Sequence, residues 1–385
     1  MTPQIRSIVR TNPHFLNPLG PMPPRFPIRS GELVGPDYIA NYEFHALWYD
    51  LFYDPSGTMV VASAPPLCNL SEALVQAGGE FRCGGEPQAF VTVPMNRCAE
   101  FWIDVENARE PTLTFSGKGI SWEGVPGSNH CGWFAGRRAL VTMSKNNDLE
   151  WIRDWLSLNV RAHGADAVLL YDNGSSAYSL ESLLEVMAGV PGIDVAVVVD
   201  WPFKYGPQGP PWDSDFCQYA ALQHARWRFL SAARCVLNSD VDEWVVTPDG
   251  KPLFGFCEDS PGGVLAFYGR WCYVPERAAG GPLWRHRHHS HYRPSEDLCP
   301  PKWVAVPASI PEDAQWRVHF IAGGPEPVIV PGILYRHFRR VSNSWKYRRD
   351  QLLPADDPAT ALVDEELLAA FARVEEGLDW CSPAS

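Results

Sequence analysis

The segment that decides the interpretation of this chain is Cys235-Val236-Leu237-Asn238-Ser239-Asp240-Val241-Asp242-Glu243-Trp244-Val245-Val246. An apolar run leads into an acidic cluster and a second apolar run follows, which indicates a buried strand. Side chains two apart in a strand share a face, so we expect Asp240 and Asp242 on one side and Val241 in the core. Neighbouring carboxylates repel unless a cation or a proton lies between them. Their oxygens suit Mg²⁺ or Mn²⁺, and the alternative is an acidic turn that closes a strand.

Upstream of this segment, short apolar strands alternate with helices. The expected strands are 139–143, 167–171 and 193–199, and the expected helices are 149–163, 180–187 and 215–233. Asp148 has the position of a helix N-cap and Gly164 that of a C-cap. This alternation is typical of an α/β fold with a parallel, doubly wound sheet. Ligands bind such sheets at the carboxyl ends of the strands. The residues expected at that edge are Met143, Lys145, Asp172, Asn173, Asp240 and Asp242.

The chain divides into four expected segments. They are a Pro-rich arm at 1–36, a β-rich accessory module at 37–136, the sheet domain at 137–345 and a helical tail at 346–385. Short strands with turn signals predict a β-sandwich-like fold for the accessory module. Its aromatic residues could bind glycans, but a packing platform for the sheet domain is the favoured interpretation.

Composition narrows the classes of function. The 385 residues suffice for two domains with a large core. The net charge of −13 argues against broad binding to nucleic acids or anionic membranes. The sequence shows no signal peptide or transmembrane segment, and its ten scattered cysteines form no zinc pattern and no disulfide framework. We therefore expect a cytoplasmic protein, with peripheral association at the inner membrane as an alternative.

Five stretches together resemble GT-A glycosyltransferases, in the order found in that fold. They are Lys145–Ile152, His163–Asp166, Tyr171–Ser176, Gln218 and Ser239–Trp244. The chain is most similar to glycosyltransferase family 92 and its family-2-like bacterial relatives, over about residues 138–345. The resemblance implies a GT-A (nucleotide-diphospho-sugar transferase) fold. It also implies metal-dependent transfer of a sugar from a UDP- or GDP-sugar donor to a glycan acceptor, in cell-surface or capsular polysaccharide biosynthesis.

The resemblance also assigns roles to single residues. Donor contacts fall on Met143, Lys145, Asp172, Asn173, Gln218 and Asp240, and the Mn²⁺ or Mg²⁺ ligands are Asp240, Asp242 and His319. Asp242 is expected to bind the metal directly, and Asp240 to lie nearer the ribose. Asn147 departs from the family, which has Glu at this position. The structural alternatives are an Asx-turn for Asp172 and a core position for His319.

The reaction is displacement at the anomeric carbon with loss of a nucleoside diphosphate. A bound cation stabilises the charge that gathers on the leaving group, which makes Asp242 a catalytic candidate. An inverting enzyme, the expected outcome, also needs a carboxylate to accept the proton of the acceptor hydroxyl. Glu276, Glu312 and Asp313 are the candidates for this base. Glu276 is preferred because it follows a strand and an aromatic loop.

Two further clusters are conspicuous. The tract Trp284–Arg293 contains four histidines and three arginines, and it is expected to be a mobile basic loop over an anionic acceptor or the donor diphosphate rather than a zinc site. Arg336, His337, Arg339 and Arg340 either contact phosphate or form a solvated helix face. Trp201 and Trp271 either stack on sugar or pack in the core.

Two rival functions remain open. A sugar nucleotidyltransferase also binds a nucleotide and a metal on a wound sheet, but it normally has a glycine-rich loop near the first strand, and residues 143–148 are not glycine-rich. A glycan-binding protein that has lost activity is the non-enzyme alternative. The intact Asp240 and Asp242 count against it.

Overall fold

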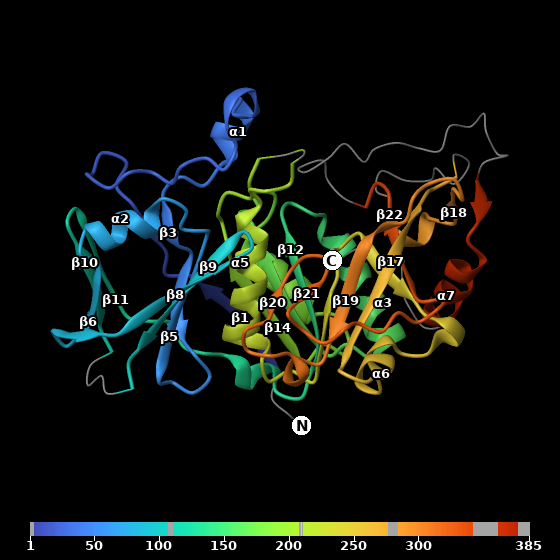
Figure 1. The fold of residues 1–385 in the computed structure, drawn as a ribbon. Helices are drawn as coiled ribbons and strands as arrows, with labels where there is room; N and C mark the ends of the chain where they lie inside the picture. Colours follow the sequence, from blue (N-terminus) through green and yellow to red (C-terminus); the bar gives the residue numbers. More distant parts are fainter. Residues whose placement is uncertain are drawn as a thin grey trace.

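The structure is a computed structural model that describes residues 4–106, 111–207, 209, 211–275, 284–341 and 361–375. A nine-stranded mixed sheet with flanking helices forms the larger part, and a β-rich module stands beside it (Figure 1). The order of the nine strands is β1 (Ile5–Arg10), β14 (Val195–Asp200), β13 (Ala167–Asp172), β12 (Arg138–Ser144), β15 (Cys235–Asn238), β19 (Cys299–Ala305), β17 (Val264–Cys272), β22 (Leu334–Phe338) and β16 (Glu243–Val246).

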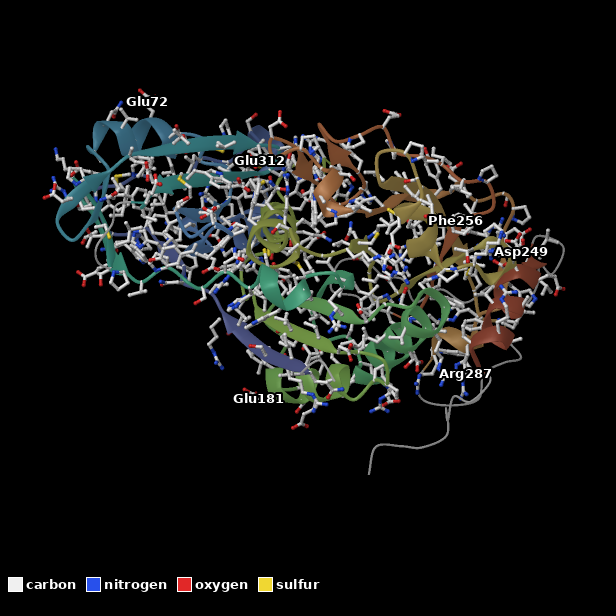
Figure 2. All side chains as sticks on the ribbon, turned by 90° about the horizontal axis from the view of Figure 1, so that it is seen from below. Glu72, Glu181, Asp249, Phe256, Arg287 and Glu312 are labelled. Atoms are coloured by element: carbon white, nitrogen blue, oxygen red, sulfur yellow. The ribbon has the colours of Figure 1, made fainter. Side chains whose placement is uncertain are left out.

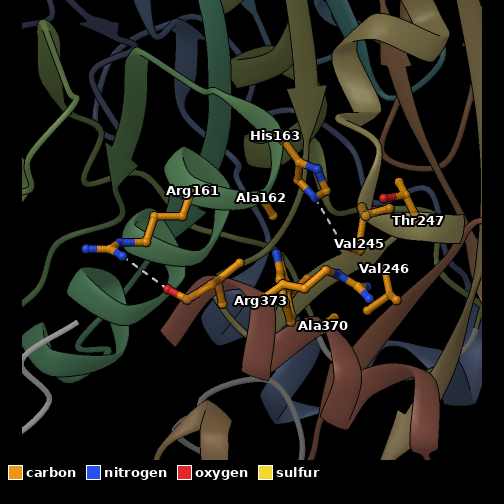
Figure 3. A pocket seen from close by; sticks show the side chains of 11 residues that line it. Arg161, Ala162, His163, Val245, Val246, Thr247, Ala370 and Arg373 are labelled. Carbon is orange, nitrogen blue, oxygen red and sulfur yellow. Dashed lines mark hydrogen bonds between the residues drawn. The ribbon is translucent and has the colours of Figure 1, made fainter. Parts of the chain in front are cut away.

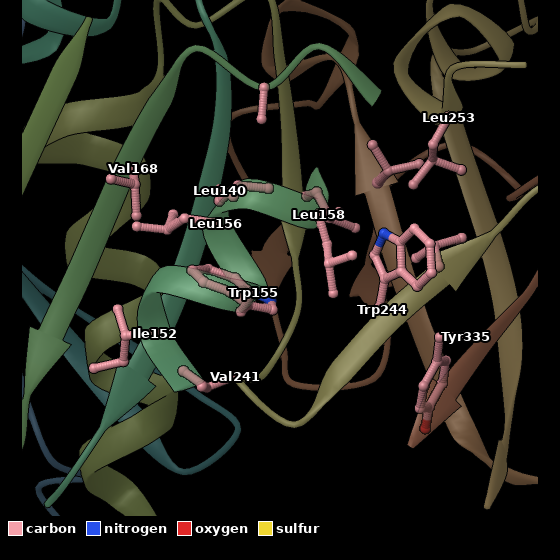
Figure 4. Close-up of a cluster of buried hydrophobic side chains, with 14 of the residues drawn as sticks. Leu140, Ile152, Trp155, Leu156, Leu158, Val168, Val241, Trp244, Leu253 and Tyr335 are labelled. Carbon is pink, nitrogen blue, oxygen red and sulfur yellow. The ribbon is translucent and has the colours of Figure 1, made fainter. Parts of the chain in front are cut away.

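Strands β1, β14, β13, β12 and β15 run parallel to one another. The side chains of β12, β13, β14 and β15 are almost entirely buried because helices cover both faces, which explains the continuous apolar runs in the sequence, whereas those of the edge strand β1 are mostly half-buried or exposed. One face packs on α3 (Leu149–His163) and α4 (Leu180–Ala188), as the cluster in Figure 4 shows in part. The other face packs on α5 (Phe216–Ala225) and the π-helix Arg226–Leu230 that continues it.

The predicted limits of α3 are confirmed at both ends. The Asp148 side chain accepts a hydrogen bond from the Glu150 N–H at 2.8 Å, which caps the first turn. Gly164 ends the helix with φ = +72°, a left-handed conformation that glycine adopts without strain. The chain therefore leaves α3 in the direction that starts β13.

The sequence had suggested a sheet that is parallel throughout, but the observed sheet is mixed. Strand β19 pairs antiparallel with both β15 and β17, and β16 pairs antiparallel with β22. The decisive segment is also not one strand. Residues 239–242 form a turn, closed by the Glu243 N–H on the Asp240 carbonyl at 3.0 Å, between β15 in mid-sheet and β16 at an edge. Because the backbone turns here, the expected two-residue alternation of Asp240 and Asp242 does not hold.

The N-terminal segment differs from the irregular arm that its prolines suggest. Residues Ile5–Arg10 form β1, which pairs in parallel with β14 from Ile5↔Val195 to Arg10↔Asp200. The sheet domain thus takes one of its two edge strands from this N-terminal segment. The segment between β1 and the accessory module contains β2 (His14–Phe15) and α1 (Pro36–Asn41).

The accessory module consists of two four-stranded antiparallel sheets that share one apolar core. The first sheet is β4 (Asp50–Tyr53), β5 (Met59–Ala64), β9 (Cys98–Asp104) and β8 (Phe90–Met95). The second is β11 (Ile120–Gly124), β10 (Leu113–Gly117), β6 (Glu80–Cys83) and β7 (Glu86–Gln88). Trp48 lies in the centre of this core, within 5.3–6.1 Å of the rings of Phe81, Phe101, Phe115 and Trp122.

A buried polar network joins the accessory module to the sheet domain. His224 Nε2–H donates to Asp50 Oδ2 at 2.7 Å, and the Tyr171 hydroxyl donates to His224 Nδ1 at 2.8 Å. Arg228 Nη1 also donates to Asp50 Oδ2, and the Asn12 N–H donates to Oδ1 at 2.8 Å. Asp50, His224 and Tyr171 are at most 1% exposed. The two parts therefore share a charged core as well as an apolar one.

The remaining elements complete both layers. They are β3 (Ala46–Trp48), α2 (Leu70–Gln76), α6 (Leu253–Glu258), β18 (His291–Tyr292), β20 (Gln315–Trp316), β21 (Ile321–Ala322), β23 (Leu362–Val363) and α7 (Glu365–Glu375). Asp364 starts α7 and is held by the buried Arg336 guanidinium through two hydrogen bonds of 2.8 and 2.9 Å. In the described part of the chain, no helix has the length and apolarity needed to cross a bilayer.

Candidate functional site

A pocket of about 750 Å³ lies where the sheet domain meets the accessory module. The lining residues are Arg97, Tyr205, Trp212, Asp215, Gln218, Tyr219, Asp240, Glu243, Trp271, Pro300, Lys302, Val318, His319, Phe320, Tyr335, His337 and Arg339. They come from the β8–β9 turn, the loop after β14, α5, the turn between β15 and β16, the β20–β21 connection and the antiparallel half of the sheet. Six of them are aromatic, and the charged ones gather in two groups.

The first charged group surrounds Lys302. Its ammonium lies 2.9 Å from Asp240 Oδ2 and 3.1 Å from Glu243 Oε2, and its side chain is only 2% exposed. Burial by itself would lower the pKa of Lys302, but the two carboxylates outweigh burial and raise the pKa above its usual range. The ammonium is thus a permanent cation beside Asp240, whose side chain is 30% exposed. Sequence reasoning missed Lys302, because an isolated lysine after two prolines carries no pattern.

Asp242 is not among the described lining residues, and it is paired with a histidine that is. His337 Nε2–H donates to Asp242 Oδ2 at 3.2 Å, and each side chain is 8% exposed. The imidazole stacks on Trp271 with ring centroids 4.0 Å apart, and the Arg339 guanidinium lies 4.1 Å from the same indole. Trp271 therefore holds the histidine as part of the pocket wall. The sequence had suggested either a phosphate contact or a solvated helix face for His337. The helix face is wrong, because Leu334–Phe338 is the buried strand β22, and the partnership with Asp242 was not foreseen.

The metal ligands expected from the resemblance are not assembled as a set of three. Among the residues that the structure describes, no three His, Cys, Asp or Glu side chains group closely enough to hold a metal ion. His319 lines the same pocket as Asp240, and its Nδ1–H donates to the Pro301 carbonyl at 3.0 Å. The Asp242 carboxylate is the ligand type that Mg²⁺ and Mn²⁺ prefer, and the His337 imidazole offers a nitrogen beside it. Binding of either ion stays a prediction.

The donor contacts predicted nearer the start of the sheet are mostly occupied by structural hydrogen bonds. Asp172 is 1% exposed and accepts from the Ser175 N–H at 2.8 Å and the Ser175 hydroxyl at 2.6 Å, so it forms the turn that was the structural alternative. Asn173 donates to the Trp201 and Phe203 carbonyls. Of the predicted donor residues in the described chain, only Gln218 and Asp240 line the pocket.

Met143, Lys145 and Asn147 precede α3 and lie outside the pocket lining in the part of the chain described. Met143 is 9% exposed and pairs with Tyr171 across the β12–β13 register. The Asn147 side chain donates to the Ser144 hydroxyl at 3.1 Å. Nucleotide contact by Met143, Lys145, Asp172 and Asn173 stays a prediction.

The histidine-rich tract is a brace rather than the expected mobile loop. His286 and His289 are fully buried. His286 Nε2–H donates to the Val241 carbonyl, in the middle of the acidic turn Ser239–Asp242, at 2.9 Å. His289 Nε2–H donates to the Arg339 carbonyl, just after His337. The tract therefore supports both backbone segments that carry the Asp242–His337 pair.

Of the three candidate bases, the structure describes two, and neither of these lines the pocket. Glu276 lies outside the described residues. Glu312, labelled in Figure 2, and Asp313 are exposed at the surface. Trp201 is fully buried and packs edge-on against Tyr171, whereas Trp271 lines the pocket. Asp215, Asp240 and Glu243 are the acidic side chains among the described lining residues.

A second cavity, of about 190 Å³, lies between α3, β16 and α7 (Figure 3). His163 Nε2–H donates to the Val245 carbonyl at 3.0 Å, and Arg161 Nη1 donates to the Val374 carbonyl at 3.2 Å. Burial lowers the pKa of His163 to about 4, so this histidine is neutral. The polar side chains of His163 and Arg161 are thus used to join α3 to β16 and α7. The larger pocket is therefore the better candidate site.

Comparison with known proteins adds little to this geometry. Neither the known protein-family profiles nor the sequences of curated proteins match the chain. One similar solved structure is that of "WbbM bifunctional glycosytransferase" in its apo form, with 16% sequence identity and a TM-score of 0.25. The match covers 42% of this chain and 27% of that one, so the chain spans about a quarter of the length of the structure it matches. A likeness of this size does not establish the fold or the activity of this chain.

Proposed function

We propose that this protein is a GT-A-type glycosyltransferase that moves a sugar from a nucleotide-diphosphate donor to a glycan acceptor, with inversion at the anomeric carbon. The observation that carries the proposal is the 750 Å³ pocket, whose lining combines aromatic side chains with the Asp240–Glu243–Lys302 group and with His337, the partner of Asp242. Aromatic faces suit the apolar faces of sugar rings, and fixed charges suit a diphosphate. The resemblance at Tyr171–Ser176 and Ser239–Trp244 agrees with this assignment.

The charged group has a clear role in such a reaction. Asp242 and His337 would hold Mn²⁺ or Mg²⁺, which when bound would neutralise charge on the departing diphosphate. Lys302 fixes the position of Asp240 and Glu243, since its ammonium bonds both carboxylates. His286 fixes the backbone between Asp240 and Asp242. The site is therefore held in place before a ligand arrives, which lowers the cost of binding.

The decisive experiment is a thermal-shift screen of the full chain with UDP- and GDP-sugars, with and without Mn²⁺, followed by an assay for donor hydrolysis. We expect stabilisation by one nucleotide-sugar only when Mn²⁺ is present, and loss of that stabilisation in Asp242→Asn.

The alternatives give different results in the same screen. Stabilisation by nucleoside triphosphates in preference to nucleotide-sugars would indicate a nucleotidyltransferase. Glycan binding that Asp242→Asn leaves unchanged, with no nucleotide-sugar effect, would indicate a glycan-binding protein. Glu72→Gln, at an exposed position of the accessory module (Figure 2), is the matched carboxylate control and should behave as the wild type.

A further inference from the structure

The accessory module contributes one side chain to the pocket, Arg97 in the β8–β9 turn. Arg97 has φ = +60°, a left-handed conformation that a non-glycine residue keeps only when its surroundings impose it. Gln315 of the sheet domain imposes it in part: its Oε1 accepts from the Asn96 N–H at 3.2 Å and its Nε2 donates to the Asn96 carbonyl at 2.8 Å. The turn is therefore a fixed part of the pocket wall.

Arg97 is held to Asp215 through one of its three guanidinium nitrogens, Nη1. Nη1 donates to Asp215 Oδ1 at 2.8 Å and to Oδ2 at 3.1 Å, and the group lies 4.7 Å from the centre of the Tyr219 ring. Toward the rest of the described chain, Nε and Nη2 make no hydrogen bond. The Arg97 side chain is 24% exposed and that of Asp215 only 11%. A ligand in the pocket thus meets N–H donors more readily than the carboxylate that balances them.

The surroundings of Arg97 suit a sugar. Tyr205, Trp212 and Phe320 line the same pocket, and Trp212 and Phe320 are 37% and 48% exposed. Exposed rings of this size offer stacking faces to a pyranose. The Arg317 guanidinium lies 5.1 Å from the centre of the Phe320 ring, which adds a second cation near these faces.

The donor is expected at the other charged group. Asp240, Asp242, Lys302 and His337 belong to the acidic turn, β19 and β22, whereas Arg97, Asp215 and Tyr219 belong to the β8–β9 turn and the beginning of α5. Within the described chain, the Arg97 guanidinium contacts Asp215 and Tyr219 and not the Lys302 group. The Arg97 side of the pocket is thus left for the acceptor.

We propose that Arg97 is a specificity-determining residue that selects acceptor glycans whose terminal sugar carries an anionic group. The planar guanidinium fork matches the two oxygens of a carboxylate or a phosphate, and such charge-assisted pairs are the strong hydrogen bonds of proteins. This inference rests on the proposed function, because it names the acceptor of the same site. It also gives the accessory module a role in substrate choice.

Three probes test the inference on the full chain: p-nitrophenyl β-D-glucuronide, p-nitrophenyl β-D-glucoside 6-phosphate and the neutral p-nitrophenyl β-D-glucoside. Their dissociation constants are measured by NMR titration with wild type, Arg97→Gln and Asp215→Asn. We expect at least one anionic probe to bind wild type roughly ten- to a hundredfold more tightly than the neutral probe. The carboxylate and phosphate arms identify which group is preferred.

Arg97→Gln should remove this preference and leave the neutral probe unchanged. Asp215→Asn should keep or strengthen the preference, since it removes only the competing carboxylate. Arg82→Gln is the matched control, because Arg82 is a half-exposed arginine of the same module, paired with Glu80. If Arg97→Gln melts at a lower temperature than wild type, Arg97→Lys serves as the second variant. It keeps the positive charge but lacks the planar pair of N–H donors, so it should retain only part of the preference for the anionic probe.

Two results would overturn the inference: a wild type with no preference for either anionic probe, or an Arg97→Gln variant with the wild-type preference. The nucleotide-sugar thermal shift distinguishes this failure from failure of the proposed function. That shift should be the same in Arg97→Gln and wild type. If nucleotide-sugars produce no thermal shift in wild type but the anionic probe is still preferred, the proposed transferase function is refuted and the anion site at Arg97 is supported.

Discussion

Replacing Asp50 by alanine should strongly destabilise the protein, because Asp50 is the acceptor on which the two parts of the molecule converge. Its carboxylate takes hydrogen bonds from His224, Arg228 and the Asn12 N–H. Asp50→Ala leaves these donors without their acceptor, and Arg228, whose side chain is 4% exposed, loses its buried counter-ion. Removal of one partner from a buried ion pair costs about 3–5 kcal/mol. That is a large fraction of the roughly 5–15 kcal/mol that stabilises a typical protein.

The assay is urea unfolding of full-length protein, followed by tryptophan fluorescence and far-UV circular dichroism. Asp50→Ala should lower the free energy of unfolding by about 3–5 kcal/mol, and Glu72→Ala, at an exposed position, by less than about 0.5 kcal/mol. The double variant Asp50→Ala/Arg228→Met should lose less than the sum of the single variants, because it removes the orphaned cation as well.

The same prediction has a pH dependence. Burial alone would raise the pKa of Asp50, but Arg228 and the hydrogen bond from His224 outweigh burial and lower it. A carboxylate whose pKa is lowered by folding stabilises the protein above its unfolded pKa, and that contribution is lost as the pH falls through the folded pKa. The difference between wild type and Asp50→Ala should therefore shrink below about pH 3.8. A destabilisation of less than about 1 kcal/mol at neutral pH would refute the reasoning, since it would mean that the buried Arg228 needs no counter-ion.

Three further predictions concern the site and the C-terminal helix. Gly269→Ala should cost about 1–3 kcal/mol and weaken nucleotide-sugar binding, because its Cβ would lie 2.1 Å from Tyr335 Cζ and push that ring into the pocket; unchanged melting and binding would contradict this. His286→Ala should raise the dissociation constant for Mn²⁺ with nucleotide-sugar roughly tenfold, since one hydrogen bond to the acidic turn is lost, and calorimetric titration that gives the wild-type constant would disprove it. Asp364→Asn should cost about 3 kcal/mol at neutral pH, because Arg336 lowers the pKa of Asp364 against the effect of burial; this stabilisation is lost as the pH falls below about 3.8, so circular dichroism across an acid titration should show the two proteins converging.

Four of the five strands of the parallel half, β12 to β15, could be predicted because their signals are local, whereas β1 was missed among the prolines of the N-terminal segment. The buried strands at 138–144 and 167–172 are continuous apolar runs, and Asp148 and Gly164 mark the ends of α3. The antiparallel half could not be predicted in the same way. Strand β22 pairs with both β16 and β17, and these pairings depend on contacts between segments far apart in the sequence. Local pattern does not encode them.

The site shows the same division. The acidic turn stands out in the sequence, and the structure places Asp240 in the pocket. Its partner Lys302 and the arginine in the β8–β9 turn are single residues whose importance comes only from tertiary position. The histidine-rich tract misled for the opposite reason: its composition suggests a solvated basic loop, whereas burial of His286 and His289 makes two of its members backbone braces.

The pairing of β1 with β14 has a consequence for biosynthesis. As the ribosome makes the chain, Ile5–Arg10 emerges long before its hydrogen-bonding partner Val195–Asp200, which appears only after the whole accessory module has been translated. Until then the nascent strand is an unpaired edge that contains three aliphatic residues and two arginines. Parallel pairing across such a separation in sequence is slow, and exposed edges invite association between chains. Arg6 and Arg10 are well placed to keep the waiting strand soluble.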